Sequence, residues 1–106
     1  MADVCISRED ARMYLQDVTP MWRAFWFHMH LMAKNLEEFA DGLATIGDDV
    51  FAYHLGGQKN DLARWVQEVI GDSELAQELT HVRTKEEAAR AARMRVTALK
   101  EIFTTS

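Results

Sequence analysis

Histidines are the residues of this chain with the most versatile chemistry, and the sequence contains four of them: His28, His30, His54 and His81. An imidazole can ligate a metal, transfer a proton or make a structural hydrogen bond. Two metal ligands on one helix would stand three or four residues apart, whereas His28 and His30 are two apart. No second cysteine or closely spaced carboxylate completes a tetrahedral set. We therefore expect no metal and no cofactor, and we expect the histidines to lie in the core or at helix ends.

His54 has two alternative roles, because it precedes Gly56-Gly57, where the chain should make a tight reversal, and stands seven residues before Asp61. At the end of a helix, its imidazole could donate to unpaired carbonyls or meet the Asp61 carboxylate across the loop. Alternatively, His54 could act as a general base in a pocket formed with Asn60 and Asp61. No nucleophile motif or phosphate-binding loop accompanies the pair, so the pattern favours a structural His54 and predicts no catalytic residue and no enzyme.

An apolar segment, residues 21–33 (MWRAFWFHMHLMA), is the second informative feature. Some of its aromatic rings must be core, since Trp and Phe bury large areas. Yet the segment holds more aromatic and methionine side chains than one face of a small helical domain can bury. We therefore expect at least one of Trp22, Trp26 and Met29 to lie in an exposed patch that contacts a partner.

Basic residues are concentrated at the C-terminal end. From Arg83 onward there are six basic and three acidic residues, a balance of +3, against six basic and fourteen acidic residues before it, a balance of −8. This distribution argues against a nucleic-acid binder, which needs a dominant basic face. These C-terminal basic residues form either a solvated helix face with local Glu pairing or a docking site that includes Arg90 and Arg93. The asymmetry could also support intramolecular docking or head-to-tail self-association.

Helical periodicity dominates the rest of the chain. Start signals and apolar residues at helical spacing predict helices from Ser7 to Leu15, Asn35 to Ile46, Asp48 to about His54, Asn60 or Asp61 to Ile70, Asp72 to Leu79, and Thr84 to the C-terminal end. Gly47 should end the second of these and Asp48 should cap the third. Thr84 and Glu87 should form a capping box at the start of the last helix. One face of that helix should be lined by apolar residues: Ala88, Ala92, Val96, Leu99 and Phe103. The segment Phe25–Leu31 could be strand, loop or helix. Because no partner strand is visible, we interpret it as buried loop or helix.

Length and composition indicate one helical domain. At 106 residues with a single proline, the chain predicts an all-α fold: a compact single-domain bundle of five or six short helices with a longer C-terminal helix, and a loose N-terminus over residues 1–6. The lone Cys5 excludes an internal disulfide. The acidic N-terminus is unlike a signal peptide, and no apolar run is long enough to cross a bilayer. We expect a cytoplasmic protein without membrane insertion.

Several short motifs follow one another between Phe25 and Leu79. They are Phe27-His28, Lys34–Phe39, Tyr53-His54-Leu55, Asn60-Asp61-Leu62 with Trp65, and Gly71-Asp72 with Leu75-Ala76. This series resembles a small uncharacterised domain family found in archaea and bacteria, in which an aromatic residue usually replaces Leu62. The resemblance implies a helical fold and no particular activity. It also implies that His28, His54 and Asp61 belong to one polar cluster.

Together these patterns predict a non-catalytic protein–protein interaction or accessory module. We expect it to self-associate, plausibly as a homodimer, or to dock on a larger partner through Trp22, Trp26, Met29, Arg90 or Arg93. The alternative is a small-ligand or metal-binding domain built around His28, His54 and Asp61, with Asn60 beside them.

Overall fold

The computed structural model describes residues 6–55 and 59–105. The predicted loose N-terminus and the predicted reversal at Gly56-Gly57 lie outside the described residues, except for Ile6. The elements are α1 (Arg8–Leu15), η1 (Met21–Arg23), β1 (Phe25–His28), β2 (Leu31–Ala33), α2 (Leu36–Thr45), α3 (Asp48–His54), α4 (Asp61–Trp65), η2 (Val66–Ile70), α5 (Ser73–Leu79) and α6 (Lys85–Thr105). The fold is therefore mostly helical with a small two-stranded sheet, and the all-α prediction is too strict.

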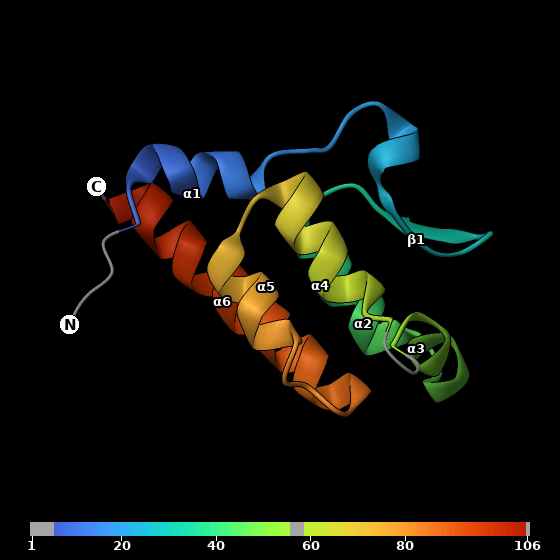
Figure 1. Cartoon of the computed structure of the whole chain (residues 1–106). Helices are drawn as coiled ribbons and strands as arrows, with labels where there is room; N and C mark the ends of the chain where they lie inside the picture. Colours follow the sequence, from blue (N-terminus) through green and yellow to red (C-terminus); the bar gives the residue numbers. More distant parts are fainter. Residues whose placement is uncertain (1–5, 56–58, 106) are drawn as a thin grey trace.

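Helix α6 is the longest element, and α1, α2 and α5 all pack against it (Figure 1). Its inward face carries Ala88, Ala92, Val96 and Leu99, each at most 1% exposed. These residues recur every three or four positions, as a helix buried along one stripe requires. The prediction of a long C-terminal helix with this apolar face is confirmed.

Local capping signals account for most of the helix boundaries. The side chains of Ser7, Asn35, Asn60 and Asp72 each accept a hydrogen bond from a backbone N–H in the first turn of the helix that follows. At the start of α6, the N–H of Glu87 donates to Thr84 Oγ1 at 3.1 Å and the N–H of Thr84 donates to Glu87 Oε1 at 3.3 Å. This reciprocal pair is the predicted capping box.

One predicted helix boundary is wrong. Asp48 is the first residue of α3, and its N-cap is Gly47, which makes no side-chain cap. Gly47 does not end α2 either, because that helix ends at Thr45 and both Ile46 and Gly47 have extended backbone. By contrast, Gly71 does end η2, since it adopts a left-handed conformation with φ of 89° and donates its N–H to Val66 O.

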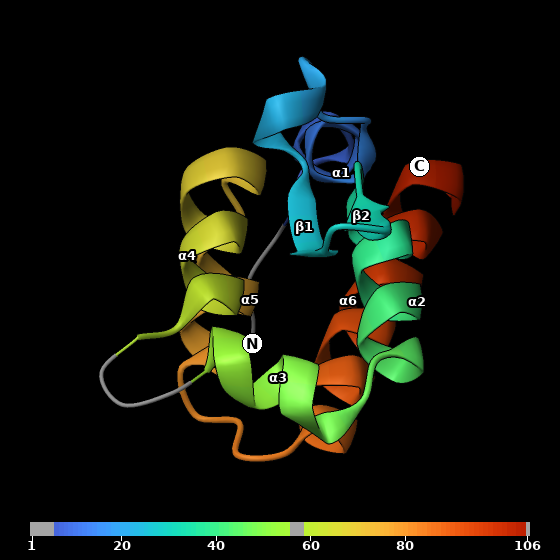
Figure 2. The same ribbon diagram turned by 90° about the vertical axis from the view of Figure 1, so that its right-hand side faces the viewer.

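The segment interpreted as buried loop or helix is instead an antiparallel hairpin. Strand β1 pairs with β2, so that Phe25 faces Ala33 and Trp26 faces Met32, with an irregularity before His28 (Figure 2). The side chains alternate as a strand demands: Phe25 and Phe27 are buried, whereas Trp26 and His28 are exposed. The partner strand begins only three residues after β1 ends, within the same apolar segment.

The outer edge of the hairpin is closed by two helix side chains. Trp65 in α4 donates from Nε1 to the carbonyl of Arg23 at 2.8 Å, and His54 in α3 lies with Nε2 2.8 Å from the carbonyl of Phe27. A strand edge normally needs a third strand or water for such groups. Here an indole and an imidazole take that place, which holds the hairpin against the helices.

Candidate functional site

Four large apolar side chains lie exposed on η1 and the hairpin. The exposed fractions are 61% for Met21, 77% for Trp22, 42% for Trp26 and 80% for Met29. We call these four residues the hairpin patch. Exposed tryptophan and methionine side chains are a recurrent feature of protein-binding surfaces, and these four come from one short segment, residues 21–29. The structure thus places all three residues that the sequence proposed for an exposed patch, Trp22, Trp26 and Met29, at the surface.

The buried side chains of strand β1 hold the hairpin patch in place. The ring of Phe25 makes edge-to-face contacts with Phe27, Phe39 and Trp65, at centroid distances of 4.8, 5.3 and 5.7 Å. Trp26 Nε1 lies 3.4 Å from the carbonyl of Met21 and so links η1 to β1. The Trp26 ring therefore projects from a strand whose inward residues are fixed in the core, and its bond to Met21 holds η1 beside that strand.

The two charged residues within the hairpin segment are basic, whereas Asp17 and Glu38 lie just outside this segment and bond to its C-terminal end. Between Val18 and Leu36 the sequence contains Arg23 and Lys34 and no acidic residue. Phe25 faces Ala33 in the hairpin. Arg23, two residues before Phe25, and Lys34, directly after Ala33, therefore lie at the same end of the hairpin, which we call the hairpin base. Both side chains are exposed. The hairpin patch is therefore flanked by positive charge in a protein of net charge −5.

A shallow cleft of about 400 Å³ lies between β1 and α3. It is lined by Phe27, His28, Asp49, Val50 and Tyr53. The Tyr53 ring is 69% exposed. The cleft shares His28 with the outward face of β1, the face that also carries Trp26, so it continues the exposed surface of the hairpin toward α3. Sequence reasoning missed this cleft, because its two walls come from segments that are distant in the chain.

Of the predicted polar cluster, the structure brings His54 and Asp61 together. His54 Nδ1 lies 2.9 Å from Asp61 Oδ2, and Nε2 lies 2.8 Å from the Phe27 carbonyl. The imidazole is only 6% exposed, and each ring nitrogen has an oxygen partner. Lys59 approaches Asp61 Oδ2 to 3.5 Å and also lies 4.2 Å from the centroid of the Tyr53 ring. This network ties β1, α3 and α4 together.

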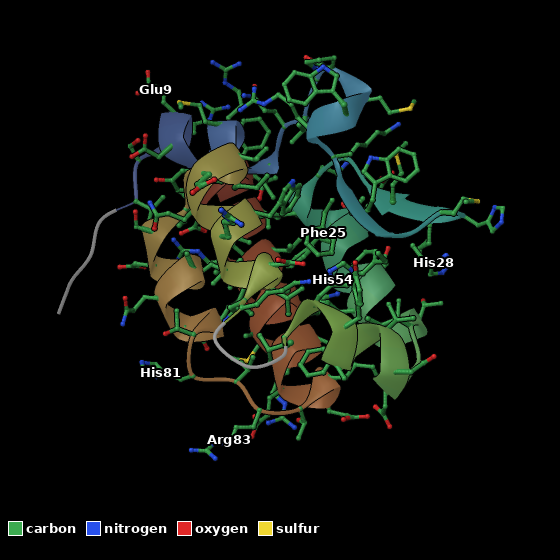
Figure 3. The ribbon with its side chains drawn as sticks, turned by 45° about the vertical axis from the view of Figure 1, so that its right-hand side comes forward. Glu9, Phe25, His28, His54, His81 and Arg83 are labelled. Atoms are coloured by element: carbon green, nitrogen blue, oxygen red, sulfur yellow. The ribbon has the colours of Figure 1, made fainter. Side chains whose placement is uncertain are left out.

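The other two members of the predicted cluster have different environments. Asn60 accepts from the N–H of Ala63 and donates from Nδ2 to the Leu79 carbonyl at 3.1 Å, so it joins the start of α4 to the end of α5. His28 is exposed on the hairpin, whereas the buried His54 ring lies against the carbonyl of Phe27, the residue before His28 (Figure 3). Its Nδ1 accepts from the N–H of His30 at 3.2 Å. No group of three His, Cys, Asp or Glu residues suited to a metal occurs within residues 6–55 and 59–105.

Most basic side chains of α6 bond to neighbouring parts of the fold. Arg93 pairs with Asp41 and Lys100 with Glu37, both in α2. The hydrogen bond from Lys100 lowers the pKa of Glu37. Arg90, the other residue of the predicted docking stripe, is exposed beside a shallow hollow that also contains Glu78 and Met94.

Arg95 and Asp72 form the most buried ion pair of the described chain. Two Arg95 nitrogens donate to the two carboxylate oxygens of Asp72 at 2.6 and 2.7 Å, and Asp72 is 1% exposed. Burial by itself would lower the pKa of Arg95, but the hydrogen bonds and charges of Asp72 and Glu74 outweigh it and raise that pKa. Asp72 also caps α5 through the N–H of Leu75. Intramolecular pairing is therefore the main role of these α6 cations.

Residues 24–104 match the model of one protein family, which covers most of the chain. The chain belongs to the family of unknown function DUF5752. This confirms the predicted membership in an uncharacterised domain family. No curated protein and no solved structure matches the chain. Among the described residues, no helix is both long enough and apolar enough to cross a membrane.

Proposed function

We propose that this chain is a non-catalytic protein-binding module of the cytoplasm, and that the hairpin patch is its contact surface. The observation that carries the proposal is the exposure of Met21, Trp22, Trp26 and Met29 on one short segment. Each such side chain would lose unfavourable contact with water on binding, at about 25 cal/mol per Å² of apolar surface buried. Tryptophan is enriched among the residues that contribute most to binding energy in protein interfaces. Methionine is frequent at adaptable binding surfaces.

A ligand or metal domain built on His28, His54 and Asp61 has less support. His54 uses both ring nitrogens on Asp61 and on the Phe27 carbonyl, so metal ligation or proton transfer by His54 would require breaking one of these bonds. His28 contributes to a different surface, the cleft beside α3. The pair His54–Asp61 is better explained as a connection between elements than as a reactive site.

Site-specific photo-crosslinking in cells that make the protein tests the proposal. The photoreactive residue p-benzoylphenylalanine replaces Met29 in one variant and Met94 in the other. Both methionines are exposed, at 80% and 65%, but Met94 lies on α6, away from the hairpin. We expect a discrete protein adduct from position 29 that Trp22→Ala weakens, and none from position 94. Equal adducts from both positions, or no adduct from position 29, would contradict the proposal.

A further inference from the structure

We propose that the hairpin patch binds an acidic protein segment that carries at least one bulky apolar side chain. This inference rests on the proposed function and adds the chemistry of the partner. The apolar part follows from the exposed tryptophans and methionines, and the acidic part follows from the charges that surround them.

The hairpin base carries two cations that form no ion pair with a described residue, although Asp17 bonds to Asn35 beside Lys34 and lines the same hollow as Arg23. Neither the Arg23 guanidinium nor the Lys34 ammonium has an ion-pair partner among the described residues, whereas Arg93, Arg95 and Lys100 of α6 all have one. Glu38 approaches this region, but its Oε1 accepts from the backbone N–H of Lys34. The residues from 18 to 36 carry a charge of +2, so the remainder of the chain carries −7. The basic hairpin is thus the exception on an acidic molecule, and it favours a partner of the opposite charge.

A second copy of this chain fits the surface less well. A two-fold symmetric dimer through the hairpin patch would bring two identical basic surfaces together. Charge repulsion would then oppose the apolar contact. An anionic membrane is also disfavoured, because Asp48 and Asp49 are exposed at the start of α3, and Asp49 lines the cleft that continues the surface. A protein segment can place its acidic residues at the hairpin base and keep them away from α3.

The surface also suggests how the partner is oriented. The hairpin base lies at one end of β1, and the cleft lined by His28, Val50 and Tyr53 lies at the other. Strand β1 is four residues long and separates them by roughly 10 Å, at about 3.3 Å per residue. We therefore expect acidic side chains against Arg23 and Lys34, with the apolar anchor close to the cleft. A segment of about twelve residues covers this distance in extended or helical form.

A selection from random peptides of about twelve residues displayed on phage tests the inference. The target is the full chain, and Trp22→Ala/Met29→Ala protein serves as the counter-selection target. Selected peptides are then titrated against the wild-type chain, Arg23→Glu/Lys34→Glu protein and Arg90→Glu protein. All these positions are exposed, and circular dichroism with thermal melting checks that every variant is folded. Sedimentation velocity of the chain alone and co-sedimentation with phosphatidylserine vesicles complete the set.

We expect enriched peptides with several Asp or Glu residues and one large apolar residue. Their affinity should fall at least tenfold with Arg23→Glu/Lys34→Glu and change little with Arg90→Glu. Neutral or basic peptides that still require Trp22 and Met29 would overturn the acidic partner and leave the proposed function standing. Self-association through the hairpin would likewise overturn the acidic partner and leave the proposed function standing. Vesicle binding that depends on Trp22, or no selected peptide that depends on the hairpin patch, would overturn both.

Discussion

His54 is the residue on which the arrangement of the hairpin and its neighbouring helices depends most directly. Its ring contacts a carboxylate that follows it in the chain, Asp61, and a carbonyl 27 residues before it, that of Phe27. It also packs 4.9 Å from the Phe25 ring, centroid to centroid. One side chain therefore links the inward face of β1, the end of α3 and the start of α4. In a buried setting, such links matter because each lost partner leaves an unsatisfied polar group.

Replacing His54 with alanine should lower the free energy of unfolding by roughly 2–4 kcal/mol, because it removes a buried ring and leaves the Phe27 carbonyl without its partner. Urea unfolding followed by circular dichroism measures the change. His81→Ala is the matched control, since His81 is exposed, and should shift stability by no more than about 0.5 kcal/mol. Equal stability of the two variants would exclude the structural role of His54.

Tyr14 gives the molecule a specific alkaline sensitivity. Burial raises the pKa of Tyr14 above its ordinary value of 10.0, and the carboxylates of Asp10 and Asp72 raise it further. A raised pKa means that the folded state holds the phenolic proton more tightly than the unfolded state. Its contribution to stability is complete below the unfolded value and is lost as the pH rises toward the folded pKa.

Tyr14→Phe should therefore reduce the loss of stability between about pH 9 and pH 11, where a tyrosine in the unfolded chain ionises. The measurement is the urea midpoint of both proteins across this range. Other groups titrate here as well, but they contribute to both curves, so the difference isolates Tyr14. Tyr53→Phe, at an exposed tyrosine, is the control and should leave the slope of the wild type unchanged. Parallel curves for Tyr14→Phe and wild type would refute the assignment.

At the scale of elements, helix α2 and the hairpin meet at Gly42. A Cβ atom added there would lie 2.6 Å from Cζ of the Phe27 ring and closer still to Cε2. Phe27 is 2% exposed and is held by the aromatic core, so the ring cannot move aside easily. Glycine in the middle of a helix costs about 1 kcal/mol relative to alanine. Its presence in α2 is explained by this close approach.

Gly42→Ala should consequently destabilise the protein by about 1–3 kcal/mol despite the better helix propensity of alanine. Chemical denaturation of Gly42→Ala, Phe27→Leu and the double variant Gly42→Ala/Phe27→Leu gives the comparison. In the double variant the smaller, more flexible leucine should make room, so the two substitutions together should cost less than the sum of their separate effects. A stabilised single variant would show that α2 and β1 do not press on each other at this point.

The sequence predicts elements well where the signal is local. Ser7, Asn35, Asn60 and Asp72 cap the helices expected of them, and Thr84 with Glu87 forms the expected capping box, because each cap acts over three or four residues. The hairpin was missed for the opposite reason. Its turn lacks the Asn-Gly or Gly-Gly signal of tight hairpins. The groups that close its edge, His54 and Trp65, come from distant helices.

In the candidate site, too, the features with a local sequence signal could be predicted, whereas those that depend on tertiary packing could not. Exposure of Trp22, Trp26 and Met29 could be anticipated, because the apolar segment held more side chains than a small core can bury. The link between His54 and Asp61 could also be anticipated from their spacing across a loop. The separation of His28 from that pair could not, since it depends on the hairpin. The cleft beside Tyr53 depends on tertiary packing of β1 against α3 and has no local signal.

At the scale of the whole molecule, the basic C-terminal part of the sequence and its acidic remainder are joined within the fold. Arg93, Arg95 and Lys100 reach from α6 to acidic residues of α2 and α5. The two exposed pairs, Arg93 with Asp41 and Lys100 with Glu37, are each worth at most about 1 kcal/mol, so their main consequence is to offset charge at the surface. The exposed Arg23 and Lys34 of the hairpin segment, by contrast, have no ion-pair partner among the described residues.

Helix α1 completes the core although it lies outside the segment that matches the family, residues 24–104. It runs antiparallel to the C-terminal half of α6: Arg8 donates to the Phe103 carbonyl, and Tyr14 lies close enough to Arg95 to feel its charge. Ala11, fully buried, faces inward from α1. Because α6 is a long helix with one apolar stripe, removing α1 would leave that stripe partly uncovered.

A chain that begins at Asp17 should therefore melt at a markedly lower temperature and bind the dye ANS, because part of the apolar face of α6 becomes exposed. Ala11→Asp should reproduce much of this effect in the full-length chain by placing an unpaired charge in the same interface. Met13→Asp, on the exposed side of α1, is the matched control and should melt like the wild type. If the shortened chain and Ala11→Asp both retain the wild-type melting temperature, α1 is an appendage, and residues 24–104 hold the complete core.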